Sequence, residues 1–145
     1  MKNLLFLVFC TSFFTNIYAQ DIIFLKSIQD VSKSEAKSIA DKLTLDYSGY
    51  HYKETFEEKE FIRFRYIQTG KEDLLIVFSC LQNNKYSFST IAGNKSDIHT
   101  IWKKYFNPNH QMGVFSSDDY IKNKDNGLEF RFYVTSESAT IKDFS

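Results

Sequence analysis

Cysteine, proline and glycine are all scarce in this chain of 145 residues, which has two cysteines, one proline and five glycines. Cys10 lies in an apolar segment near the N-terminus, and Cys80 is the only other cysteine. If that segment is a cleaved leader, the mature protein has a single thiol and an internal disulfide is excluded. The chain also lacks low-complexity segments and detectable repeats. Its aromatic side chains, 17% of all residues, are therefore expected to form the core.

Net charge is also lacking, since 18 basic side chains balance 18 acidic ones. A neutral chain offers no electrostatic basis for binding nucleic acid or an anionic membrane surface. The glycine-aromatic motif of RNA-binding sheets is absent as well. We therefore expect no nucleic-acid partner.

The first nineteen residues have the pattern of a secretory signal peptide. A short basic start at Lys2 precedes an apolar run over residues 4–14, and Ala19 provides a small residue at a cleavage position. An apolar run of this length is short for a bilayer, which requires about 20 residues. We expect cleavage between Ala19 and Gln20, export to the periplasm or the outside of the cell, and no stable membrane span afterwards. An uncleaved anchor is the alternative.

Residues 61–92 organise the rest of the chain. Three segments with the two-residue period of β-strands, 61–68, 74–81 and 86–92, are joined by turns at Gly70 and at Asn83-Asn84. The turns predict pairing of Tyr66 with Leu75 and, in the second hairpin, of Leu75 with Ala92. One face of the sheet would then collect Ile62, Phe64, Tyr66, Leu75, Val77, Leu81, Tyr86 and Phe88. The other would collect Phe61, Arg63, Arg65, Ile67, Leu74, Ile76, Phe78, Cys80 and Ile91.

Two helices are predicted on either side of this stretch. Ser32 and Glu35 have the spacing of a capping box at the start of a helix that ends at Ser48-Gly49. A second helix is predicted after a cap at Asn94 or Ser96 and stops at Pro108. Its apolar stripe consists of Ile98, Ile101, Trp102, Tyr105 and Phe106.

The remaining segments complete an α+β domain over residues 20–135. Residues 21–28 and 128–134 are predicted strands, 50–56 is a weaker one, 109–120 is irregular with one helical turn from Ser117, and 136–145 is a loose tail. The element order predicts an antiparallel sheet of four to five strands with the two main helices on one face. It resembles a ferredoxin-like topology with an extra strand. The alternative is a cystatin-like or NTF2-like arrangement, which requires 50–56 to be a full strand.

No catalytic or metal-binding motif is present. The histidines, His51, His99 and His110, have no second histidine or cysteine at ligand spacing, and His99 is expected to face solvent. Cys80 is expected to be an inert sheet thiol. We therefore predict no cofactor, no metal and no catalytic residues, and favour a non-enzymatic protein.

Two surfaces are candidates for binding. The first is a basic-aromatic sheet face with Phe61, Arg63, Arg65 and Tyr133, or the loop 109–119, either of which suits a protein partner. The second is a pocket between sheet and helices that suits a small ligand or an enzymatic reaction. It would be lined by Tyr47, Tyr50, His51, Tyr52 and Tyr66. An envelope immunity or inhibitor protein is a special case of the first hypothesis, and the oligomeric state is left open.

Overall fold

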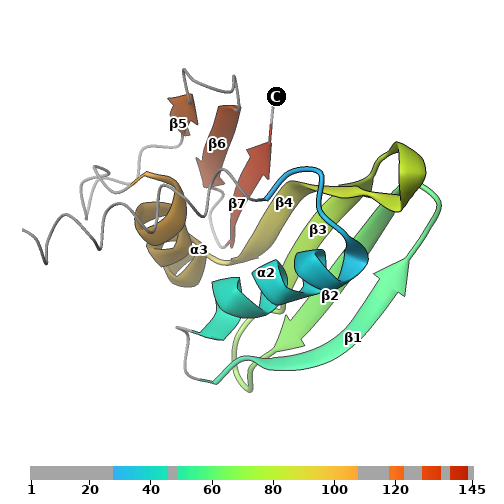
Figure 1. Cartoon of the computed structure of the whole chain (residues 1–145). Helices are drawn as coiled ribbons and strands as arrows, with labels where there is room; N and C mark the ends of the chain where they lie inside the picture. The colour runs from blue at the N-terminus through green and yellow to red at the C-terminus, as the bar shows by residue number, and fades with distance from the viewer. Residues whose placement is uncertain (1–27, 46–48, 108–117, 123–128, 135–137, 144–145) are drawn as a thin grey trace, which may run out of the picture.

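The computed structural model describes residues 28–45, 49–107, 118–122, 129–134 and 138–143. The elements are α2 (Lys33–Leu45), β1 (His51–Glu57), β2 (Phe61–Ile67), β3 (Leu74–Cys80), η1 (Gln82–Asn84), β4 (Tyr86–Asn94), α3 (Lys95–Ile101), η2 (Trp102–Phe106), β5 (Asp118–Lys122), β6 (Glu129–Val134) and β7 (Ser138–Asp143). The strands form one antiparallel sheet in the order β1-β2-β3-β4-β7-β6-β5, with two longer helical segments, α2 and α3–η2, and the short 3-10 turn η1 (Figure 1). The α+β class is confirmed, whereas four to five strands is too low a count.

Two strands account for the low count. The predicted loose tail contains β7, which pairs with β4 on one side and β6 on the other. Only Ala139 and Ile141 are buried in β7, so its alternating pattern is too short to stand out from a polar sequence. β5 forms where the sequence predicts a helical turn, and it pairs with β6. The predicted signal peptide lies outside the described residues, as does almost all of the predicted strand over 21–28.

The order of strands also bears on the predicted topology. Every pairing in the described part of the sheet is antiparallel. A ferredoxin-like fold contains βαβ units, whose strands run parallel, so that topology is not confirmed. The full strand that the cystatin-like or NTF2-like alternative requires is present as β1.

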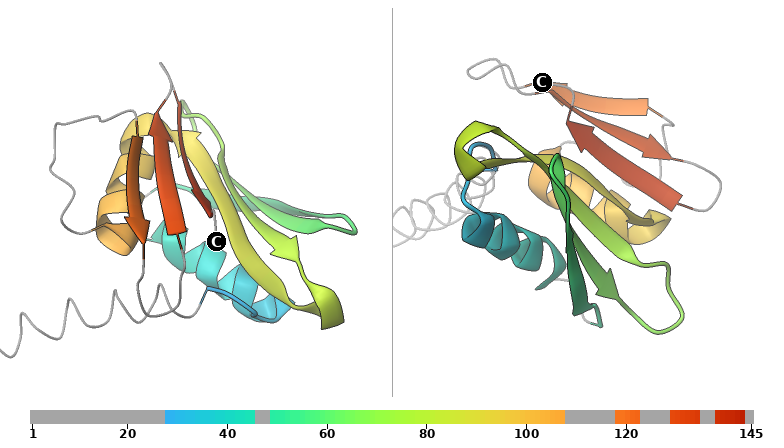
Figure 2. Two further views of the ribbon diagram at one scale, coloured as in Figure 1. Left: turned by 90° about the horizontal axis from the view of Figure 1, so that it is seen from above. Right: turned by 90° about the vertical axis from the view of Figure 1, so that its right-hand side faces the viewer.

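Both helices lie on the same face of the curved sheet (Figure 2). The capping box at the start of α2 is confirmed, because Ser32 N donates to Glu35 Oε2 at 2.8 Å and Glu35 N donates to Ser32 Oγ at 3.3 Å. Asn94 caps α3 by accepting from Ser96 N at 3.1 Å. α3 continues as the π-helical turn η2, in which Asn107 N donates to Trp102 O at 2.8 Å.

The core between sheet and helices is a continuous set of aromatic rings. Phe78 of β3 contacts Phe64 of β2 and Phe88 of β4, with centroids 6.1 and 5.8 Å apart. Phe88 contacts Phe106 of η2 at 5.6 Å, and Phe106 contacts Phe130 of β6 at 5.2 Å. Edge-to-face and offset contacts of this kind add stability beyond the burial of apolar area. The rings thereby form one series of contacts from β2 to β6.

Register in the β2–β3 hairpin differs from the prediction by one residue. Tyr66 pairs with Leu74, because a turn closes where Lys71 N donates to Gln68 O, one residue earlier than predicted. Gly70 has the expected positive φ of 77°. The shift places Leu74, Ile76 and Phe78 on the helix-facing side and leaves Leu75 and Val77 half-buried on the outer side. Both sides of this strand are apolar, so its sequence pattern does not distinguish the two registers.

In the β3–β4 hairpin the pairing of Leu75 with Ala92 is confirmed, but a β-bulge follows. Val77 pairs with Thr90 and Phe78 with Phe88, so Ser89 is an extra residue in β4. Because the extra residue changes the alternation, both Phe88 and Ile91 face the helices. The prediction that these two side chains lie on opposite faces is wrong.

Candidate functional site

The outer face of the β1–β2 hairpin carries the first candidate site. Phe56 pairs with Arg63 and Glu54 pairs with Arg65, and these four side chains lie on the side of the sheet away from the helices. Phe61 lies at the start of β2 on the same side. We call Phe56, Phe61 and Arg63 the aromatic–arginine patch. Its side chains are held by two adjacent strands, so their backbone positions are fixed by the sheet ladder.

Arg63 is the polar member of this patch. Its guanidinium carbon lies 4.9 Å from the ring centroid of Phe56, a cation–π distance, and the rings of Phe56 and Phe61 are 6.0 Å apart. Arg63 makes no ion pair in the described part of the chain, and its buried Nε has no hydrogen-bond partner there. Phe56 is 42% exposed. The patch therefore combines an exposed ring with an uncompensated positive charge.

Arg65 has a different environment, although sequence analysis grouped it with Arg63. Its Nη1 is 2.8 Å from Glu54 Oε1 and its Nη2 is 2.6 Å from Asp73 Oδ2. Hydrogen bonds to Glu54 and Asp73 raise the pKa of Arg65. Because its guanidinium already binds two carboxylates, Arg65 is an internal link between β1, β2 and the loop before β3.

Tyr133 does not belong to the patch. It lies in β6, and strands β3, β4 and β7 separate β6 from β2. Adjacent strands are about 4.8 Å apart, so roughly 19 Å of sheet lies between β2 and β6. The prediction that Tyr133 forms one basic-aromatic surface with Phe61 and the arginines is therefore wrong. Most of the candidate loop 109–119 lies outside the described residues.

The predicted tyrosine pocket is not assembled among the described residues. Tyr50 and Tyr66 are buried, but Tyr50 donates to Asp97 Oδ2 at 2.9 Å and Tyr66 to Asp41 Oδ1 at 2.7 Å. Burial is the main cause that raises the pKa of both phenols, and these hydrogen bonds to carboxylates raise it further. His51 lies on the outer face opposite Ile67. The hydroxyl groups therefore point to separate partners, and Tyr47 lies outside the described residues.

A hollow of about 610 Å³ does lie beside Tyr52, between the start of α2 and β1. Its floor is Phe64 and its rim carries hydroxyl and ammonium groups. The residues that line it are Ser32, Lys33, Ser34, Lys37, Tyr52, Thr55 and Phe64. Lys37 Nζ lies 4.3 Å from the Tyr52 ring centroid, and the Tyr52 and Thr55 hydroxyls are 2.7 Å apart. Of the four predicted pocket residues that the structure describes, only Tyr52 lines this hollow.

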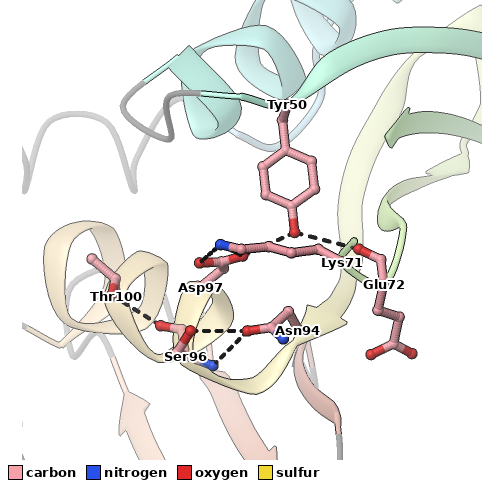
Figure 3. A network of polar contacts seen from close by, with 7 residues as sticks. All are labelled: Tyr50, Lys71, Glu72, Asn94, Ser96, Asp97 and Thr100. Carbon is pink, nitrogen blue, oxygen red and sulfur yellow. Dashed lines mark hydrogen bonds and ion pairs between the residues drawn. The ribbon is translucent and has the colours of Figure 1, made fainter. Parts of the chain in front are cut away.

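Sequence reasoning missed a polar network at the start of β1 (Figure 3). Lys71 Nζ lies 2.9 Å from Oδ2 of the buried Asp97, which also accepts from the Tyr50 hydroxyl. The same hydroxyl lies 3.3 Å from Glu72 O. The network connects the residue before β1, the β2–β3 loop and α3. These groups are distant in the sequence, so no local motif indicated them.

The described residues contain no group of three or more His, Cys, Asp or Glu side chains that could hold a metal ion. Cys80 is half-buried, with Sγ 3.6 Å from Leu81 O. His99, expected in solvent, is buried against the ring of Phe132, with centroids 6.1 Å apart. It faces inward because α3 packs against β4 and β7 and turns this side of the helix toward the sheet.

Comparisons with known proteins found no match: no protein-family model, no curated protein and no solved structure is significantly similar to the chain. Within the described residues, no helix is both long and apolar enough to span a bilayer.

Proposed function

We propose that the protein is a small exported binding module, without catalytic activity of its own, that recognises a protein partner through the aromatic–arginine patch. The observation that carries this proposal is the state of Arg63: a guanidinium that lies against an exposed phenylalanine and has no ion pair among the described residues. Arginine beside aromatic rings is the composition typical of the central residues of protein interfaces.

The chemistry of the patch defines the partner surface. A guanidinium binds a carboxylate through two parallel hydrogen bonds, and Phe56 and Phe61 offer apolar contact beside it. We expect the partner to present an aspartate or glutamate flanked by apolar side chains. Arg65 contributes indirectly, since its bonds to Glu54 and Asp73 hold β1 and β2 in place.

The test is a capture experiment with tagged protein and cell-envelope extract from the native host. Wild type should retain a protein that the Phe56→Ala/Arg63→Ala variant does not, and the purified partner should bind the variant at least about tenfold more weakly. Lys85→Ala is the matched control, because it also removes one positive charge but lies in the turn before β4. Equal binding by wild type and the patch variant would contradict the proposal.

A second candidate function is small-ligand binding in the hollow beside Tyr52. The specific observation in its favour is the combination of an apolar floor, Phe64, with hydroxyl groups on the rim. A ligand that binds wild type but not a Ser34→Trp variant, which would fill the hollow, would favour this function. The same ligand should still bind the Arg63→Ala variant.

A further inference from the structure

β1 lies at one end of the described sheet, and no described strand pairs with its outer edge. Along one side it pairs with β2, and it is one of the two terminal strands in the sheet order, the other being β5 (Figure 1). All seven of its residues are exposed, including Tyr52 at 49% and Phe56 at 42%. An open edge presents unpaired N–H and C=O groups that can bind another extended strand.

A β-bulge determines which residues of β1 share a face. Tyr52 pairs with Tyr66 and Glu54 with Arg65, so Lys53 is an extra residue and both Lys53 and Glu54 oppose Arg65. Tyr52 and Thr55 face the helices, since they oppose the buried Tyr66 and Phe64. Tyr52 and Thr55, which share the helix-facing side, are therefore separated by two residues. In a regular strand, one residue separates neighbouring side chains of the same face.

From this arrangement we propose that two copies of the chain pair through β1, antiparallel and about a two-fold axis at the bulge, so that one sheet continues across the dimer. In this register Lys53 lies opposite Glu54 of the second copy, Tyr52 opposite Thr55, and His51 opposite Phe56. Each pair joins residues of one face, which an antiparallel ladder requires. A strand with regular alternation could not meet this condition in the same register, because paired residues would lie on opposite faces.

Charge selects the same register. The two-fold axis repeats the Lys53–Glu54 pair, which gives two attractive pairs at the centre of the interface. A slip of one residue in one direction would place Lys53 opposite Lys53 of the second copy. A slip in the other direction would place Glu54 opposite Glu54 of the second copy. Like charges directly opposite each other destabilise a strand pair, and opposite charges stabilise it. Arg65 occupies only Oε1 of Glu54, so Oε2 faces no described cation.

Lysine and bulges on edge strands usually prevent association. Here the lysine is followed by a glutamate of opposite sign, and the pair is self-complementary about the axis. Each copy uses β1 once, so the contact is isologous and closes at two subunits rather than extending into a fibre. The inference goes beyond the proposed function and does not depend on it.

The test measures molar mass by sedimentation equilibrium over a range of concentrations. Wild type should be a dimer, and Lys53→Glu and Glu54→Lys should each dissociate at least about tenfold more readily, because each replaces two attractive pairs by two repulsive ones. An equimolar mixture of the two variants should regain the dimer, since two adjacent carboxylates of one chain then face two adjacent ammonium groups of the other. The double variant Lys53→Glu/Glu54→Lys should be a dimer on its own.

Lys59→Glu is the matched control, because it changes the same charge in the β1–β2 turn and should leave the dimer intact. A monomeric wild type, a dimer that both single variants retain, or a mixture that stays monomeric would each overturn the proposal. The mixing experiment also separates a loss of pairing from a loss of folding, because an unfolded variant cannot be rescued by its complement. Arg63→Ala should remain dimeric, so failure of the proposed function would leave this result unaffected.

Discussion

β1 and β3 are strands of equal length in one sheet, yet their side chains have opposite environments. All seven residues of β1 are exposed, whereas Leu74, Ile76 and Phe78 of β3 are completely buried. β3 lies between two strands and under the aromatic core, but β1 lies at the edge. Burial therefore fixes β3 through its side chains, while β1 depends on its ladder with β2 and on attachments at its two ends.

Those attachments are polar. At the start of β1 the Tyr50 hydroxyl binds Asp97. At its end the Glu57 carboxylate accepts from the Tyr86 hydroxyl at 2.9 Å and pairs with Lys33 of α2. An edge strand with exposed, interacting side chains can thus keep one position without a hydrophobic anchor, which leaves its surface available for contacts.

The largest expected effect is the difference in stability between two variants, one that loses a phenylalanine ring from β3 and one that loses a phenylalanine ring from β1. Phe78→Ala should lower the free energy of unfolding by about 3–5 kcal/mol, because it leaves a cavity among the rings of Phe64 and Phe88. Phe56→Ala should lower it by no more than about 1 kcal/mol, since its ring is partly in water. Urea unfolding of the two variants checks the contrast. Equal losses would show that β1 carries a buried contact that the structure does not have.

A smaller effect is expected at the attachment of β1. Asp97→Asn keeps the shape of the side chain but loses the ion pair with Lys71, at a cost of about 1–3 kcal/mol. Hydrogen exchange should then become faster in the first residues of β1 and stay unchanged in β3. Thr100→Ala is the control, because among the described residues its hydroxyl bonds only the α3 backbone at Ser96 O. Uniform acceleration over both strands would argue against a local attachment.

The smallest expected effect is a change in how the free energy of unfolding depends on pH under alkaline conditions. The pKa values of Tyr50 and Tyr66 are raised in the folded protein from 10.0, chiefly by burial. The unfolded chain therefore loses these protons first, and the stability from the neutral phenols is present below pH 10 and decreases as the pH rises above it. Replacing both by phenylalanine should flatten this decrease in urea unfolding measured at increasing pH. An unchanged slope would show that other groups cause it.

Local sequence signals predicted the helices well and the sheet less completely. Ser32 and Glu35 form the predicted cap, and Asn83 and Asn84 have the positive φ values expected of their turn. Register in β2–β3 could not be predicted, because both faces of β3 are apolar and either pairing buries similar side chains. The bulge at Ser89 has no sequence signal of its own. A bulge becomes evident only from the pairing of both strands.

The candidate site was predicted in part. Alternation correctly placed Phe61, Arg63 and Arg65 on one face of β2. It could not show that Arg65 is occupied by Glu54 and Asp73, since ion pairs depend on the neighbouring strand and loop. Phe56 was missed as a patch residue because the weak alternation of its segment did not establish β1 as a full strand.

The position of β7 has a consequence for the order in which the protein can assemble. β7 follows both β5 and β6 in the chain, but it lies between β4 and β6 and is the only link between the two groups of strands in the described sheet. As the chain emerges residue by residue, the β1–β4 meander and the β5–β6 hairpin can each form early, but they remain separate until β7 arrives. One of the shortest strands of the sheet, β7, is therefore the last to pair.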